Sequence, residues 1–367
     1  MRKNILVVGP LDSNGRYEGG INKILNYLEK YSDIFLQNGY KLIFQNSCLK
    51  KRNNKSIGKL SLKNILNAIA LKKEVKKKLK ESDCNLIYWH SSNRFALLKD
   101  LIIISQLRNP NVVLHIHYSE IKKILFNKKI IDKFLCHLIN NNVSNLVTMS
   151  KSTCQDFINF GIQSEKVTYI HNFYCLESNK ATHTYHTNFA NFVFIGSLDK
   201  RKGILDILEA LYKINNDNYS LSICGLFIND QIKDLFYKKI KEYQLEDKVK
   251  YLGYLDDGKK QQVYSESDCL ILPSYEEGLP LVILESLAMG LDIICSPVGS
   301  IPDIIMNEKN CLFCSPGDIE SIRKALEKVI MDRHSSICRG KRNYLLSKDF
   351  SIDNFSKQLI NLFDNID

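Results

Sequence analysis

Residues 274–290, SYEEGLPLVILESLAMG, hold two glutamates, Glu277 and Glu285, eight residues apart around a Gly-Leu-Pro turn. The apolar run at 269–272 predicts a buried strand before this turn, and residues 281–289 predict a helix after it. A turn from a buried strand into a helix is where α/β proteins bind anions, because the first N–H groups of the helix lack intrahelical acceptors. The segment therefore predicts an α/β fold with an anion site at this turn.

The residues of the turn suit a nucleotide sugar. The N–H groups of Leu281 and Val282 would open the helix unpaired and can bind a diphosphate, while Pro280 gives up no hydrogen bond there. Glu277 lies before the helix and Glu285 more than one turn inside it, so a carboxylate can reach the ligand on either side of the phosphates. The same pattern is also common scaffolding, in which Glu277 caps the helix and Glu285 is solvated.

The run E-G-L-P followed by L-E-S-L-A-M-G resembles the signature of retaining glycosyltransferases of family 4, two glutamates separated by seven residues. The spacing, the turn and the small residues Ala288 and Gly290 match that signature. The resemblance implies a GT-B fold, in which two Rossmann-like α/β domains face each other across a cleft. It also implies transfer of a sugar from a nucleotide diphosphate sugar to an acceptor hydroxyl, by a front-face displacement that needs neither metal nor cofactor.

The resemblance assigns roles to the residues of the turn. Glu277 would be a catalytic residue that holds sugar hydroxyls, and Glu285 would hold the ribose of the donor. The donor itself is expected to be a UDP-sugar. The remaining expected donor contacts in this turn are Gly278, Leu279, Pro280, Leu281 and Val282.

A second segment, FIGSLDKRKG at residues 194–203, resembles the family segment in which an arginine and a lysine neutralise the diphosphate. Lys202 matches the lysine and is expected to be catalytic, because the leaving nucleoside diphosphate gains negative charge as the glycosidic bond breaks. Ser197 occupies the position of the arginine, and Arg201 lies nearby as a candidate substitute. A lone lysine is otherwise most often a solvated surface charge.

The N-terminal half matches the family at two places. Gly19 and Gly20 follow the first predicted strand and precede a helical pattern, so they are expected to contact the donor, although a Gly-Gly pair is also ordinary turn chemistry. His117 stands where a predicted strand ends and resembles the catalytic histidine that family members place beside the reacting sugar. His115 is expected to point to the opposite face of that strand, as an interior histidine.

Apolar runs alternate with helical patterns along the chain, which predicts two parallel, doubly wound sheets. The expected domains are an acceptor-side Rossmann-like domain at 1–176, a linker at 177–189 and a nucleotide-sugar-binding Rossmann-like domain at 190–345. A final helix within 346–367 is expected to cross back to the N-terminal domain, as the resemblance to GT-B proteins implies. The strand-like runs lie at 5–9, 41–44, 85–89, 112–116 and 145–149, and then at 192–195, 221–224, 249–252, 269–272 and 292–295.

The composition is that of a soluble globular protein, with 44% apolar and 25% charged residues among 367. No apolar run reaches the roughly 18 residues that cross a bilayer, and the first one is too short for a signal peptide, so a cytoplasmic location is expected. The eleven cysteines are expected to be reduced thiols. Cys311 and Cys314 form a single CxxC pair without a second Cys or His pair at metal-ligand spacing, so no metal site is predicted.

Positive charge is concentrated in one part of the chain. The net charge is +11, and residues 41–140 hold 21 Lys and Arg against 6 Asp and Glu, a surplus of 15. No nucleic-acid-binding module is evident, so an anionic membrane surface is the expected partner, with the protein peripheral on the inner face of the cell membrane. Residues 62–79 predict an amphipathic helix, for which a core-packed helix with a solvated face is an equal alternative. Its cationic edge consists of Lys72, Lys73, Lys76, Lys77 and Lys80.

These features predict a retaining glycosyltransferase that acts on a glycan or lipid-linked glycan acceptor in the synthesis of bacterial surface polysaccharide. The main alternative is a non-catalytic, membrane-associated binding protein that keeps the fold without turnover, and it is favoured by Ser197 and by the lysine-rich face. A glycoside hydrolase that uses Glu277 and Glu285 is disfavoured, because eight helical residues would separate the carboxylates by roughly 12 Å. Such pairs stand roughly 5 to 9.5 Å apart.

Overall fold

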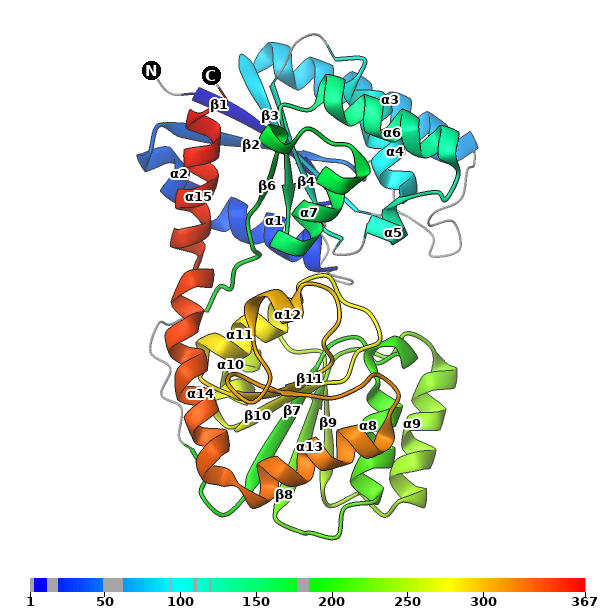
Figure 1. Cartoon of the computed structure of the whole chain (residues 1–367), viewed down its shortest axis with the longest axis vertical. Helices are drawn as coiled ribbons and strands as arrows, with labels where there is room; N and C mark the ends of the chain where they lie inside the picture. The colour runs from blue at the N-terminus through cyan, green and yellow to red at the C-terminus, as the bar shows by residue number, and fades with distance from the viewer. Residues whose placement is uncertain are drawn as a thin grey trace. The chain divides into compact units, whose positions relative to one another are not determined.

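The computed structural model describes residues 3–11, 19–48, 62–92, 94–107, 111–118, 121–176 and 185–366, with the backbone alone at 62–64 and 122–123. The chain forms two compact α/β units (Figure 1). Unit 1 comprises Met1–Asn172 together with Ile352–Asp367, and unit 2 comprises Phe173–Ser351. Most of the expected linker at 177–189 lies outside the described residues.

Unit 1 is built on six parallel strands in the order β2-β1-β3-β4-β5-β6. Its central strands are buried on both faces, and strands of that kind are continuous apolar runs in a sequence. The strands are β1 (Lys3–Gly9), β2 (Tyr40–Asn46), β3 (Cys84–Ser91), β4 (Asn111–Ile116), β5 (Asn145–Thr148) and β6 (Val167–Tyr169).

The helices of unit 1 cover this sheet. Apolar residues of α3, α4 and α6 form one core with Leu6, Trp89 and Leu114 of the strands. The last helix of the chain, α15, belongs to the same unit, since the Phe363 ring lies 5.7 Å from that of Tyr40 and 5.8 Å from that of Tyr88. The helices are α1 (Gly20–Lys30), α2 (Ser32–Gln37), α3 (Leu62–Glu81), α4 (Arg94–Ile104), α5 (Ile121–Ile124), α6 (Lys129–Asn142), α7 (Lys151–Phe160), η2 (Ser164–Lys166) and α15 (Ile352–Asp364).

Unit 2 repeats the architecture with a parallel sheet in the order β12-β11-β10-β7-β8-β9, which confirms the prediction of two doubly wound α/β sheets. Its strands are β7 (Ala190–Ile195), β8 (Tyr219–Cys224), β9 (Val249–Gly253), β10 (Cys269–Leu272), β11 (Asp292–Cys295) and β12 (Leu312–Phe313). Its helices are η3 (Lys200–Lys202), α8 (Ile204–Tyr212), α9 (Asp230–Glu242), α10 (Asp257–Ser265), α11 (Leu281–Ala288), α12 (Ile301–Ile304), α13 (Ile319–Met331), α14 (Arg333–Ser347) and η4 (Lys348–Phe350). In the described part of the chain, no helix has both the length and the apolar character needed to cross a bilayer.

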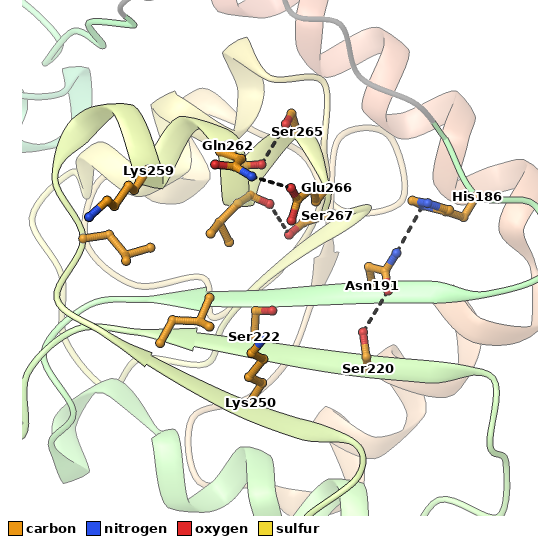
Figure 2. A pocket seen from close by; sticks show the side chains of 13 residues that line it. His186, Asn191, Ser220, Ser222, Lys250, Lys259, Gln262, Ser265, Glu266 and Ser267 are labelled. Carbon is orange, nitrogen blue, oxygen red and sulfur yellow. Dashed lines mark hydrogen bonds between the residues drawn. The ribbon is translucent and has the colours of Figure 1, made fainter.

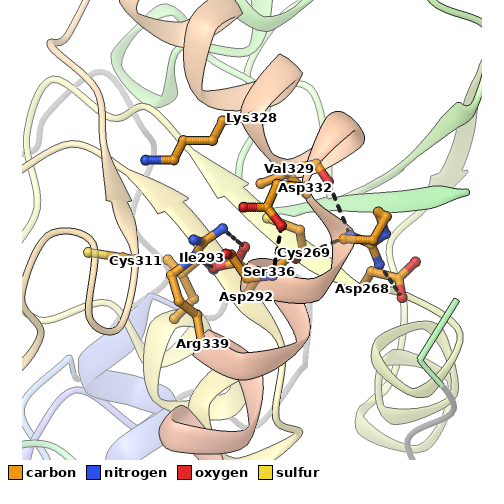
Figure 3. A network of polar contacts seen from close by, with 12 residues as sticks. Asp268, Cys269, Asp292, Ile293, Cys311, Lys328, Val329, Asp332, Ser336 and Arg339 are labelled. Carbon is orange, nitrogen blue, oxygen red and sulfur yellow. Dashed lines mark hydrogen bonds and ion pairs between the residues drawn. The ribbon is translucent and has the colours of Figure 1, made fainter. Parts of the chain in front are cut away.

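Buried ion pairs fasten α14 to the sheet of unit 2. Arg339 donates two hydrogen bonds to Asp292, at 2.8 and 2.6 Å (Figure 3). The Arg333 guanidinium lies 2.9 Å from the Asp268 carboxylate. Asp292 opens β11 and Asp268 immediately precedes β10, so both carboxylates stand at the amino ends of neighbouring strands. The opposite, carboxyl end of β10 leads into the predicted donor turn.

Candidate functional site

The predicted donor turn connects the carboxyl end of β10 to α11. Pro280 stands at the N-cap of α11 and offers no side-chain cap, so the N–H groups of Leu281 and Val282 open the helix without intrahelical acceptors. The helix N-terminus therefore presents partial positive charge at the edge where parallel α/β sheets bind ligands.

Lys202 and Glu277, two of the predicted catalytic residues, form an ion pair. The Lys202 ammonium lies 2.5 Å from a carboxylate oxygen of Glu277, and the two side chains are 15% and 7% exposed. Lys202 lies between β7 and α8, and Glu277 lies between β10 and α11, with β7 and β10 adjacent in the sheet. The fold thus joins a cation and a carboxylate that are 75 residues apart in the sequence.

Asp199, which was not predicted from the sequence, shapes the turn that carries Lys202. Its carboxylate accepts hydrogen bonds from the backbone N–H of Lys202 at 2.9 Å and from the Ser197 hydroxyl at 3.0 Å. The Arg201 guanidinium lies 3.6 Å from the same carboxylate. An aspartate directly before a helical turn is a common N-cap, so the sequence did hold this signal. Donor contacts of Ser197 and Arg201 stay predictions.

Gly203 allows the turn that carries Lys202 to lie close to the turn that carries Glu277. Its φ of +73° is left-handed, and a Cβ there would lie 2.5 Å from the Pro273 carbonyl oxygen, so glycine alone fits. The backbone N–H of Tyr275 also donates to the Arg201 carbonyl at 2.8 Å. These backbone contacts hold Lys202 within reach of Glu277.

Glu285 is buried in α11, 1% exposed, and is bound by two side chains of α10. The Lys260 ammonium lies 2.7 Å from one carboxylate oxygen, and the Tyr264 hydroxyl donates to the other at 2.8 Å. Burial, together with the neighbouring Glu285 carboxylate, raises the pKa of Tyr264 well above its usual value. The reading of Glu285 as a solvated residue is therefore wrong, while its contact with a donor ribose stays a prediction.

In unit 1, His117 directly follows β4, and its ring belongs to a cluster of ring contacts with Tyr88, His90 and His115. The rings of His115 and His117 stack with their centroids 4.2 Å apart. The expectation that these two side chains point to opposite faces is wrong, because residues two apart on a strand share a face. His90 pairs with His115 across β3 and β4, and the sequence could not indicate it because the strand register was unknown.

Hydrogen bonds connect these rings in two pairs. The Tyr88 hydroxyl lies 2.6 Å from His115 Nδ1, and His90 Nδ1 lies 2.8 Å from His117 Nε2. Burial lowers the pKa of His90 and of His115 well below the usual value and lowers the pKa of His117 to about 3. All three imidazoles are therefore neutral at pH 7.

Gly19 and Gly20 stand at the start of α1 in unit 1. A Cβ built on either residue would meet no heavy atom within 4 Å, and the φ of Gly19, −69°, is open to any residue. Neither position requires glycine for its backbone or its packing. Their contact with a donor stays a prediction.

A separate polar pocket of about 720 Å³ lies in unit 2 against β7, β8, β9 and α10 (Figure 2). Its lining includes Asn191, Ser220 and Lys250, each the second residue of its strand. The pocket also reaches Leu252 near the carboxyl end of β9, so it runs along the strands beside α10, whereas parallel sheets bind ligands outside their carboxyl ends. No predicted donor residue lines it, so the pocket is not assigned to the donor.

Two protein-family models match consecutive parts of the chain. The model described as Glycosyltransferase Family 4 matches residues 45–178, and the model described as Glycosyl transferases group 1 matches residues 177–345. The second match contains the turns of Lys202 and Glu277.

Curated proteins similar to the chain include an uncharacterised glycosyltransferase of Methanocaldococcus jannaschii, 29% identical over 180 residues. Another is the O-antigen chain mannosyltransferase B of Escherichia coli, 26% identical over 174 residues. Each alignment covers 47% of this chain and 44% or 45% of the relative, so the chain matches less than half the length of these relatives. Among solved structures, HepE of Anabaena in complex with UDP is similar over 100% of both chains, with 17% identity and a TM-score of 0.73.

Proposed function

Because the chain belongs to glycosyltransferase family 4 and has the GT-B fold, we propose that it transfers a sugar from a nucleotide diphosphate sugar to an acceptor hydroxyl. The observation that carries this proposal is the ion pair of Lys202 and Glu277 beside the uncapped N-terminus of α11. A cation, a carboxylate and unpaired helix N–H groups suit a ligand that joins a diphosphate to sugar hydroxyls.

The ion pair suggests how the donor is bound. Without a donor, the charges of Lys202 and Glu277 neutralise each other. A diphosphate oxygen would compete for the Lys202 ammonium and leave the Glu277 carboxylate to accept hydrogen bonds from sugar hydroxyls. As the glycosidic bond breaks, negative charge grows on the leaving diphosphate, where Lys202 and the N–H groups of Leu281 and Val282 would stabilise it. One preorganised donor of this kind contributes about 100- to 1,000-fold to kcat.

We further propose a retaining, front-face displacement without a metal ion. The bond between the anomeric carbon and the phosphate oxygen breaks, a bond to the acceptor oxygen forms on the same face, and the leaving phosphate takes the acceptor proton. In this scheme Glu277 and Lys202 position and stabilise charge rather than transfer a proton. The sugar contacts proposed for Gly19, Gly20 and His117 follow from the family resemblance.

A UDP-linked hexose is the proposed donor, and bacterial surface polysaccharide is the proposed product. The UDP bound to HepE supports the choice of nucleotide, and the activity named for the Escherichia coli relative supports the choice of hexose and product. The acceptor would be a glycan on a lipid carrier, so the protein would work in the cytoplasm at the inner face of the cell membrane.

Helix α3 of unit 1 is the proposed membrane contact. Its buried residues Leu71 and Val75 pack in the core, while apolar residues of its first half and lysines of its second half are exposed. These exposed residues are Ile65, Leu66, Ile69, Lys73, Lys76, Lys77 and Lys80. Apolar side chains beside several cations suit the surface of an anionic bilayer.

Thermal unfolding with UDP-, GDP-, ADP- and CMP-linked sugars tests the donor, followed by measurement of nucleotide release with lipid-linked acceptors. A ligand at 100 times its Kd adds about 2.7 kcal/mol to stability, so the matching donor should raise Tm while the others do not. Binding without nucleotide release in the presence of acceptor would favour the non-catalytic alternative. No effect of any nucleotide sugar on Tm would refute the donor site.

A further inference from the structure

Three imidazoles converge at the carboxyl edge of the sheet of unit 1. His90 lies near the end of β3, His115 lies in β4, and His117 directly follows β4. One ring nitrogen of each lies within 4.8 Å of the other two. His90 and His115 are 2% and 0% exposed, and His117 is partly exposed. Among the described residues, no other set of three His, Cys, Asp or Glu side chains converges this closely.

Each of the three rings also has a buried nitrogen without a hydrogen-bond partner. These atoms are His90 Nε2, His115 Nε2 and His117 Nδ1. Buried polar side-chain atoms nearly always have a partner, so three orphaned nitrogens in one cluster need an explanation. A bound ion would give one of them, His115 Nε2, a partner.

We propose that His90, His115 and His117 form a binding site for a divalent transition metal ion, with Zn²⁺ the best match. Neutral imidazole is a preferred ligand of Zn²⁺, which can hold three histidines and one exchangeable water at about 2.0–2.1 Å from nitrogen. Nitrogens in such a tetrahedron are about 3.4 Å apart, so closure of a separation at the upper limit of 4.8 Å requires shifts on the order of 1 Å per ring. The broad χ2 torsion of histidine permits such shifts.

The contact between His90 Nδ1 and His117 Nε2 shows where the ion would lie. At 2.8 Å, one of these nitrogens donates a proton and the other accepts it. The ring that donates can instead carry its proton on its other nitrogen, which is Nε2 in His90 and Nδ1 in His117. His90 Nδ1 and His117 Nε2 then both offer lone pairs to an ion between them. The pair keeps the same number of protons, and the two nitrogens separate from 2.8 Å toward about 3.4 Å.

The third ligand would be His115 Nε2. The other nitrogen of His115, Nδ1, lies 2.6 Å from the Tyr88 hydroxyl and would donate its proton to that oxygen. Metal-binding histidines usually make such a second contact, which fixes the tautomer that presents a lone pair to the metal. The partly exposed His117 provides the entry path. The site shares His117 with the proposed sugar contact, and the ion takes no part in the proposed transfer.

Metal titration of the full chain tests this proposal. The protein, without a histidine tag and stripped with a chelator, is titrated with Zn²⁺ by calorimetry and with Co²⁺ by visible absorption. We expect one equivalent of either ion, and a Co²⁺ spectrum of a tetrahedral site without thiolate charge-transfer bands. Thiolate bands would place the ion at cysteines and overturn the assignment, and so would the absence of stoichiometric binding.

The variants His115→Phe and His117→Phe should each lower the affinity for Zn²⁺ by at least about tenfold, the ratio that 1.4 kcal/mol represents. His137→Phe, at an exposed histidine of α6, is the matched control and should bind as the natural chain does. Circular dichroism checks the fold of each variant, and the partly exposed His117 provides the test if His115→Phe does not fold. Unchanged affinity in a folded His117→Phe variant would refute the site.

Discussion

The Lys202 ammonium can bind either the Glu277 carboxylate or a phosphate oxygen, so the carboxylate and the proposed donor compete for it. Both side chains are largely shielded from water, so the pair is stronger than one on an open surface. A donor must therefore weaken an existing contact in order to bind. Substitution of either residue changes both the empty site and the occupied one.

For Glu277→Gln, we expect kcat/KM to fall by at least about tenfold. The amide keeps the shape of the side chain but loses charge-assisted hydrogen bonds to sugar hydroxyls, each worth about 1.5–3 kcal/mol. Initial rates of nucleotide release measure the effect. The neighbouring Glu276→Gln is the control, and equal rates for the two variants would contradict the assignment of Glu277.

For Lys202→Met, we expect UDP to bind about 10- to 150-fold more weakly, while uridine binds as before. The reason is that the ammonium would contact phosphate alone, through a charge-assisted bond worth about 1.5–3 kcal/mol. Calorimetry with both ligands measures the difference. Lys200→Met, at an exposed lysine of the same turn, controls for general loss of positive charge. A similar loss for uridine would show that Lys202 does not act through phosphate.

At the scale of elements, α10 and α11 are joined by the ion pair of Lys260 with Glu285 and by the Tyr264 hydroxyl. Glu285 is 1% exposed and Lys260 is 7% exposed, so removal of one partner leaves a charge that water can hardly reach. Because α11 begins at the donor turn, this contact also fixes the helix end that would face the diphosphate.

The variant Lys260→Met should lower the free energy of unfolding by about 3–5 kcal/mol, because the Glu285 carboxylate would remain buried without its cation. The double variant Lys260→Met/Glu285→Gln should lose clearly less, because no buried charge remains. Chemical denaturation of both variants measures the two values. A double variant less stable than the single one would indicate that packing, rather than charge, dominates at this position.

The sequence predicted the strands and the turn between β10 and α11 well, and it failed where contacts cross from one element to another. Buried parallel strands are short apolar runs, and the turn at Glu277 is a local motif, so both were visible. The Lys260 contact depends on the packing of α10 against α11, which no local pattern encodes. His90 was not predicted because its pairing with His115 depends on the register of β3 and β4, which the sequence does not show. The prediction that His115 and His117 point to opposite faces was wrong for another reason, because side chains two residues apart on a strand share a face.

At the scale of the molecule, the net charge of +11 arises from residues 41–140, where the surplus is 15. Everything outside this range carries a net charge of −4, the difference of those two values. Helix α3 lies inside the basic range and adds exposed apolar side chains to it. Attraction to a bilayer should therefore be confined to one part of unit 1.

We expect the protein to sediment with anionic liposomes at low salt, not with neutral ones, and to be released as salt increases. Each well-placed lysine contributes about 1 kcal/mol at an anionic surface, and 0.1 M salt screens charges beyond about 10 Å. Replacement of Lys73, Lys76, Lys77 and Lys80 by Gln should abolish binding. Replacement of Lys233, Lys238 and Lys241 on α9 is the control, and equal loss in both variants would refute a specific role for α3.

Helix α15 follows all of unit 2 in the sequence, yet it belongs to unit 1, whose larger part, Met1–Asn172, is made long before it. During synthesis at about 5–20 residues per second, the ribosome completes all of unit 2 before Phe363 can reach Tyr40 and Tyr88. Until then, the nascent unit 1 lacks the contacts that Phe363 makes with Tyr40 of β2 and Tyr88 of β3. A ribosome that stalls late would leave the second unit whole and the first one unfinished.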